Sequence, residues 1–185
     1  MEVLIVLLVV VLGIAVWVVG IYNGLITLRL AVENCWAKID VELKRRFDLI
    51  PNLIETVKGY AAHEKDTLER VIAARNQGLS ASTPEEAAKA DNALTGALKS
   101  LFALAESYPD LKANENFMQL QEELVGTENR ISMVRQSYND SVMTYNTKIQ
   151  VFPDNIIAGM FNFTTKEFFK VEDAAERVAP KVSFS

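Results

Sequence analysis

The chain has one histidine and one cysteine, His63 and Cys35, the residue types most often used as bases, nucleophiles or metal ligands. No second histidine follows His63 at the spacing of a zinc protease, and Tyr60 stands where a di-iron Glu-x-x-His pair has its glutamate. Cys35 lies within a predicted helix beside Trp36, where a small apolar side chain packs without any chemical role. We therefore expect no catalytic residue, no metal site and no cofactor.

Other reaction and ligand classes are excluded by similar counts. No glycine-rich phosphate loop is present, and one cysteine closes no internal disulfide. The 185 residues carry 19 basic and 24 acidic side chains, a net charge of −5 that gives no general attraction to nucleic acid. We expect a non-enzymatic protein that does not bind nucleic acid.

Two polar clusters are the candidates for contact with a partner. The first is the basic run at 44–46, from which we select Arg45 and Arg46, together with Asn52. Acidic residues flank this run on both sides, so the alternative to a partner contact is that the basic side chains form ion pairs within the protein. The second is an amide-rich stretch at 114–146, from which we select Asn114, Asn116 and Gln119. Amides beside a helix seam specify partners, although they also serve simply as solubilising side chains.

These residues must be positioned by the elements around them, beginning with an apolar segment at the N-terminus. Residues 3–21 contain no charge and no amide. As a helix they extend about 28 Å, close to the thickness of a bilayer's hydrocarbon core. Trp17 and Tyr22 lie near one end, as aromatic residues at membrane interfaces do. The segment is predicted to span a membrane and to contact lipid; a cleaved signal peptide is the weaker alternative, because a basic start and a cleavage site are missing.

The charges beside this span predict its orientation. Only Glu2 precedes it apart from the amine, whereas Arg29 and Lys38 follow it. The positive-inside rule then places the N-terminus outside and the body in the cytoplasm. A periplasmic or extracellular body is the alternative, because long domains cross membranes regardless of charge.

The body is predicted to be helical. Apolar residues spaced three or four apart from Leu25 to Ile50 predict a helix that continues the span without a break. Pro51 is expected to begin a second helix, which ends in a C-cap at Gly78. Thr83, followed by Pro84 and Glu86, predicts a capping box for a third helix that ends near Ser107.

A fourth helix is predicted by a heptad repeat of six apolar residues that Pro153 ends; its members are Phe117, Leu124, Ile131, Tyr138, Tyr145 and Phe152. The apolar stretch 156–163 is a candidate for a second membrane contact. A short amphipathic helix is expected at 166–177, followed by a tail at 180–184. The predicted fold is all-α: an N-terminal transmembrane helix at 1–22, then an elongated antiparallel four-helix bundle over 23–185.

The chain resembles the bacterial LemA family over nearly its whole length. The matching stretches are YNGL at 22–25, IDVELKRRFDLIPNLIETVKGY at 39–60, AAHEK at 61–65, YPDLKANENFMQLQEEL at 108–124, GTENRI at 126–131, YNDSVMTY at 138–145 and PKVSF at 180–184. The resemblance implies a single N-terminal anchor, an elongated helical bundle, an outside N-terminus and no established enzymatic activity. It links the chain loosely to the cell envelope. Where some relatives carry a lipidated cysteine this chain has Ile21, which favours anchoring by the helix itself.

The function expected from these features is that of a membrane-anchored helical scaffold. It associates with itself, as a homo-oligomer, or docks partners at the bacterial cell membrane. The alternative is a monomeric regulatory or signalling adaptor for a membrane protease, kinase or transporter.

Overall fold

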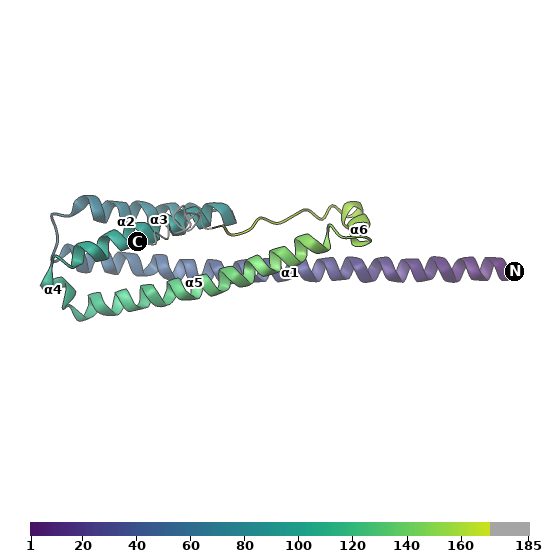
Figure 1. Cartoon of the computed structure of the whole chain (residues 1–185), viewed down its shortest axis with the longest axis horizontal. Helices are drawn as coiled ribbons and strands as arrows, with labels where there is room; N and C mark the ends of the chain where they lie inside the picture. Colours follow the sequence, from purple (N-terminus) through teal and green to yellow (C-terminus); the bar gives the residue numbers. More distant parts are fainter. Residues whose placement is uncertain (171–185) are drawn as a thin grey trace, which may run out of the picture. The chain divides into compact units, whose positions relative to one another are not determined.

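The computed structural model of the chain describes residues 1–170, and within them all regular structure is helical (Figure 1). The helices are α1 (Glu2–Lys58), α2 (Lys65–Ser80), α3 (Pro84–Ala105), α4 (Pro109–Lys112), α5 (Glu115–Lys148) and α6 (Asp154–Met160). The all-α class expected from the sequence is confirmed, whereas the elongated antiparallel four-helix bundle over 23–185 stays a prediction.

Helix α1 contains the apolar N-terminal segment and continues without interruption to Lys58. The expected continuation of the apolar segment into the first body helix is thus confirmed. The large apolar side chains from Val3 to Val19 are exposed except that of Val18, which is half-buried, and none of the most apolar stretch is buried within the protein. Among the described residues, α1 is the one helix long and apolar enough to cross a membrane.

The prediction that Pro51 begins a second helix is wrong, because Pro51 lies inside α1. A proline within a helix cannot donate the hydrogen bond that the carbonyl four residues earlier would accept. That carbonyl belongs to Phe47, and it accepts a hydrogen bond of 2.9 Å from Nε of Arg75 on α2 instead. A contact from another helix therefore compensates for the missing donor.

The predicted C-cap at Gly78 is also wrong, since α2 continues through Gly78 to Ser80. The break in the helical pattern comes earlier, at 59–64, between α1 and α2. Gly78 is required by packing: a Cβ there would lie 2.3 Å from Cζ of Phe47. The absent side chain lets the ring of Phe47 rest against the backbone of α2.

The chain divides into two compact units. The first unit contains residues 1–41 and 131–168, and the second contains residues 42–130 and continues from Phe169. Each has its own buried side chains.

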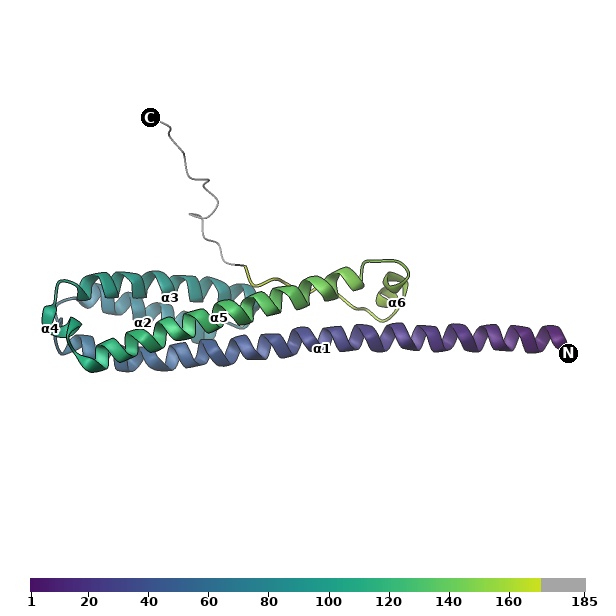
Figure 2. The ribbon, with the colours of Figure 1, turned by 60° about the horizontal axis from the view of Figure 1, so that its bottom comes forward.

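In the second unit, α2 and α3 pack with residues 42–58 of α1 and 115–130 of α5 (Figure 2). The rings of Phe102 and Phe117 lie 6.1 Å apart and join α3 to α5. Helix α3 begins with the predicted capping box: Thr83 Oγ1 accepts from the Glu86 N–H at 3.2 Å, and Glu86 Oε2 accepts from the Thr83 N–H at 3.3 Å. The core side chains of this unit include Leu43, Phe47, Ile50, Leu53, Val71, Leu94, Leu98, Leu101 and Leu124.

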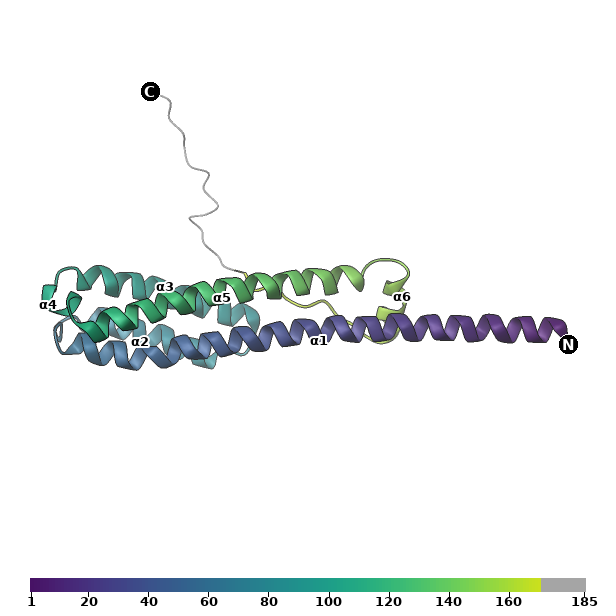
Figure 3. The same cartoon turned by 90° about the horizontal axis from the view of Figure 1, so that it is seen from below.

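In the first unit, the part of α1 that carries buried Leu25, Val32 and Ile39 packs with residues 131–148 of α5, and α6 lies beside α1 (Figure 3). The rings of Trp36 and Tyr138 lie 5.8 Å apart. The predicted heptad is confirmed as a buried seam from Phe117 to Tyr145. It fails at its last member, because α5 ends at Lys148 and Phe152 is 79% exposed.

The end of the described chain is an extended segment held against α5. Asn146 binds both backbone groups of Lys166: its Nδ2 donates to the carbonyl and its Oδ1 accepts from the N–H, each at 2.8 Å. The hydroxyls of Tyr145 and Tyr138 donate to the carbonyls of Thr164 and Glu167 at 3.0 and 2.8 Å. We call residues 164–167 the strap.

The strap lies where the sequence predicted the start of a helix over 166–177. That prediction is wrong for residues 166–170, which are not helical. Its remaining part, and the predicted tail at 180–184, lie outside the described residues.

Candidate functional site

Two helices of the second unit run antiparallel and form a groove between them. At one end Arg130 Nε of α5 lies 3.0 Å from Glu42 Oε2 of α1. At the other, Nδ2 of Asn114 donates to the Tyr60 hydroxyl at 3.0 Å. Residues late in α1 therefore lie beside residues early in α5, which is the register that brings the predicted contact residues together.

The groove has a volume of about 420 Å³ and gathers Asn52 from α1 with Asn116 and Gln119 from α5. All three side chains are exposed. Its full lining is Leu49, Asn52, Glu55, Thr56, Asn116, Gln119, Leu120 and Glu123. Three of the six residues selected from the sequence thus line one surface feature, although Asn52 is more than 60 positions from the other two along the chain.

The groove presents amide and carboxylate groups to solvent. The side-chain amides of Asn52, Asn116 and Gln119 make no hydrogen bond to any other residue in the described part of the chain, so their donors and acceptors are available. Each amide offers two N–H donors and a carbonyl acceptor, which match backbone groups and other amides. Glu55 and Glu123 add negative charge and no basic residue lines the groove, so a cationic group is favoured.

Arg45 extends the same surface beyond the groove. It lies one helical turn before Leu49 on the same face of α1. Its side chain is 58% exposed, and Nη1 lies 3.8 Å from Glu42 Oε2, a weak surface pair. The surface therefore has an acidic end in the groove and a basic end at Arg45.

Asn114 has a structural position at the start of α5. Its Oδ1 accepts from the Phe117 N–H at 3.0 Å, as an N-cap does, while its Nδ2 binds the Tyr60 hydroxyl. Both ends of the amide are thus engaged within the protein. The expectation that Asn114 contacts a partner stays a prediction, but the structure gives its side chain another role.

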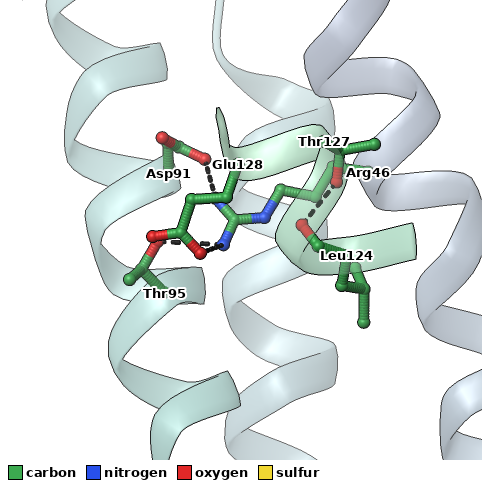
Figure 4. A network of polar contacts seen from close by, with 6 residues as sticks. All are labelled: Arg46, Asp91, Thr95, Leu124, Thr127 and Glu128. Carbon is green, nitrogen blue, oxygen red and sulfur yellow. Dashed lines mark hydrogen bonds and ion pairs between the residues drawn. The ribbon is translucent and has the colours of Figure 1, made fainter. Parts of the chain in front are cut away.

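The expectation for Arg46 is corrected by the structure, because this side chain is only 1% exposed (Figure 4). Its Nη1 lies 2.5 Å from Asp91 Oδ1 on α3, and its Nη2 lies 3.3 Å from Glu128 Oε2 on α5. Nη2 also donates to the hydroxyl of Thr95 at 3.0 Å. Arg46 of α1 thus links α3 and α5 through buried contacts. This agrees with the alternative interpretation of the basic run, which was ion pairing within the protein.

Asp91 and Glu128 are the residues of this network that sequence reasoning missed. A signal for Asp91 was present, because it falls on the stripe formed by Ala87, Leu94 and Leu98, all of them buried. A carboxylate on an apolar stripe requires a buried partner. No comparable signal marks Glu128, whose side chain is half exposed.

His63 and Cys35 lie apart from the groove. His63 is exposed in the connection between α1 and α2. Cys35, in the first unit, is partly buried with its Sγ 3.4 Å from the hydroxyl oxygen of Ser141. Within residues 1–170, no group of three or more His, Cys, Asp and Glu side chains is placed to hold a metal ion.

Comparison with known proteins finds one matching family and several similar proteins. The LemA family model matches residues 35–184. Protein LemA of Metamycoplasma hominis is 27% identical over 164 residues, covering 86% of this chain and 73% of that protein. Magnetosome proteins MamQ 2 of Paramagnetospirillum magneticum and MamQ of Magnetospirillum gryphiswaldense are each 25% identical over 181 residues.

These MamQ matches cover 84% of this chain, which spans 66% of the length of the MamQ proteins. The relatives and the exposed apolar helix together indicate a membrane-associated helical protein. By the match over 35–184, the chain belongs to the LemA family.

Proposed function

We propose that this protein is a non-enzymatic scaffold, anchored in the bacterial cell membrane by residues 3–21, that associates with copies of itself. The groove between α1 and α5 carries this proposal, since it gathers unengaged amides from two helices. Protein interfaces contain about ten direct hydrogen bonds, and amides from two helices that face one hollow supply donors and acceptors for such bonds.

The amides on this surface favour a second copy as the partner. Two copies anchored in one membrane by α1 have parallel α1 helices, so a two-fold axis between them runs along the helices and equivalent residues meet. Asn52 and Gln119 of one copy then face their equivalents on the second copy. Because each amide carries both donors and an acceptor, such like-with-like pairs form hydrogen bonds.

The proposed topology places the N-terminus outside and the second unit in the cytoplasm, based on Arg29 and Lys38 after the span. Reporter fusions at the C-terminus test it: a fluorescent protein that folds in the cytoplasm is expected to be active, and alkaline phosphatase inactive. The reverse result would place the body on the outer face.

The particle mass of the full-length protein in nanodiscs tests self-association. A homogeneous multiple of the 20.6 kDa chain is expected. Asn52→Asp and Gln119→Glu are each expected to lower the mass, because each substitution places a carboxylate opposite its own equivalent across the two-fold interface. Lys44→Glu is the matched control: its side chain is 68% exposed and pairs with Asp48, within its own helix.

The other outcomes have definite meanings. A monomeric wild-type protein would contradict self-association and favour the regulatory adaptor. An oligomer that Asn52→Asp and Gln119→Glu leave intact would remove the groove from the interface. Turnover by the purified protein that substitution of His63 or Cys35 abolishes would overturn the non-enzymatic assignment.

A further inference from the structure

The first unit exposes a group of large apolar side chains around α6. Their exposed fractions range from 41% to 79%, and the residues are Val151, Phe152, Ile156, Met160 and Phe161. We call these five residues the interfacial patch. Soluble proteins rarely gather so much exposed apolar surface in one short stretch unless something covers it.

Helix α6 separates its buried and exposed residues by face. Asp154, Ile157 and Ala158 are buried, and Lys148 Nζ of α5 lies 3.0 Å from Asp154 Oδ1. Ile156 and Met160 lie one turn apart on the other side, 53% and 68% exposed. The apolar face is therefore held outward by packing and by an ion pair on the inner face.

Contacts with α1 fix the patch at the end of the predicted span. Tyr22 follows that span directly, and its ring centroid lies 4.7 Å from that of Phe161 and 5.8 Å from that of Phe163. All three ribbon views show α6 beside α1 (Figures 1, 2 and 3). If residues 3–21 cross the hydrocarbon, the patch lies at the level where the hydrocarbon meets the headgroups.

A cation lies on the headgroup side of the same cluster. The guanidinium carbon of Arg29 lies 5.5 Å from the centroid of the Phe163 ring. Arg29 is seven residues after Tyr22, about 10 Å further along the helix. Aromatic and apolar groups at the acyl boundary with an arginine near the phosphates form the usual pattern of an interfacial element.

We propose that the interfacial patch inserts into the lipid leaflet in which the span ends, as a second membrane contact separate from the span. In this proposal the patch contacts lipid at the boundary between the headgroups and the acyl chains. The proposal rests on the membrane anchoring in the proposed function, but it does not depend on self-association.

Spin labels on the full-length protein in nanodiscs test the insertion. In a Cys35→Ala background, single cysteines replace Met160, Ile156 and, within the span, Val10. Collision with oxygen reports lipid, and collision with a water-soluble nickel chelate reports water. Labels at 160 and 156 are expected to give a high oxygen-to-nickel ratio, approaching that at 10.

Met133→Cys is the matched control, since Met133 is a 64% exposed methionine on α5 in the same unit. Its label is expected to be in water. A label at 160 that behaves like the one at 133, while the label at 10 is in lipid, overturns this inference and leaves the anchor intact. A label at 10 in water would instead contradict the anchor itself.

A second copy is the competing occupant of the patch. It would give spin–spin broadening at 160 that disappears when labelled protein is diluted with unlabelled protein, together with a low oxygen ratio. That result would assign the patch to an interface between copies and overturn lipid insertion.

Discussion

Arg75 on α2 donates a 2.9 Å hydrogen bond to the carbonyl oxygen of Phe47, the helical acceptor that Pro51 leaves without a donor. The same Phe47 places its ring against the backbone of Gly78, one turn after Arg75 on the same helix. Two residues of α2 thus engage the main chain and the side chain of one residue of α1. This double contact fixes how α1 and α2 dock within the second unit.

The role of Arg75 is tested by a double-mutant cycle with Pro51. Arg75→Met is expected to lower the free energy of unfolding by about 1–3 kcal/mol, because the Phe47 carbonyl loses its donor. In a Pro51→Ala background the loss is expected to be smaller, since the alanine supplies the helical N–H that proline lacks. Denaturant unfolding followed by circular dichroism measures both, and strictly additive effects would contradict the compensation.

Gly78→Ala and Gly96→Ala form a matched pair of glycine substitutions within helices. The first is expected to destabilise the protein by about 1–3 kcal/mol, because the new Cβ overlaps the Phe47 ring. The second meets nothing within 4 Å and is expected to stabilise by about 0.5–1 kcal/mol through helix propensity. The melting temperature is expected to fall for Gly78→Ala and to rise for Gly96→Ala. Equal shifts in the two variants would contradict the packing role of Gly78.

Two adjacent arginines are expected to differ sharply in their effect on stability. Arg46→Met removes the positive charge that pairs with buried Asp91, and about 3–5 kcal/mol of stability should be lost. Arg45→Met, at an exposed weak pair, should change stability by no more than about 0.5 kcal/mol. Parallel urea titrations give the two changes in the free energy of unfolding. Similar losses for the two variants would contradict a stabilising role for the buried Arg46 network.

The capping box predicts a pH dependence. Hydrogen bonds from the Ser82 backbone N–H and hydroxyl, and from the Thr83 N–H, hold the pKa of Glu86 below its ordinary value of 4.5. The ionised carboxylate therefore stabilises the fold above pH 4.5, and this contribution is lost as the pH falls through the lowered pKa. Glu86→Gln should lower stability at pH 7 and lose less than the wild type on acidification. Unfolding curves from pH 7 to pH 3 test this, and parallel pH profiles would contradict it.

The strap depends on one side chain for two hydrogen bonds. Asn146→Leu removes both bonds to Lys166, so the amide of Lys166 should exchange with solvent much faster. Gln136→Leu, at an exposed amide on the same helix, is the control and should leave that exchange unchanged. The exchange rate of the Lys166 amide is measured in both variants and in the wild type. If this amide stays protected in Asn146→Leu, the hydrogen bonds from Tyr138 and Tyr145 are enough to hold the strap, and the prediction is wrong.

Local signals in the sequence predicted local structure well. The heptad spacing identified buried residues from Phe117 to Tyr145, because a regular helix repeats its inward face at that interval. Thr83 and Glu86 identified the start of α3 because both partners of the capping box lie within one turn.

The errors arose where a distant residue decides the outcome. Pro51 normally ends a helix, and its donor substitute is 24 positions away at Arg75. Lys44, Arg45 and Arg46 look alike in sequence, and only the position of Asp91 on another helix makes Arg46 the buried one. The amides at 52, 116 and 119 were selected from sequence, but their common groove depends on the antiparallel register of α1 and α5.

The hydrogen bonds that Tyr138, Tyr145 and Asn146 make to the strap all go to its main-chain atoms, and the side chains of Thr164 and Glu167 are exposed. Main-chain groups are the same whichever side chain a residue carries. Substitutions at exposed Thr164 and Glu167 are therefore expected to leave the segment attached, as long as the three residues on α5 are kept. The surface chemistry of the strap can thus change in sequence without a change in how the strap is held.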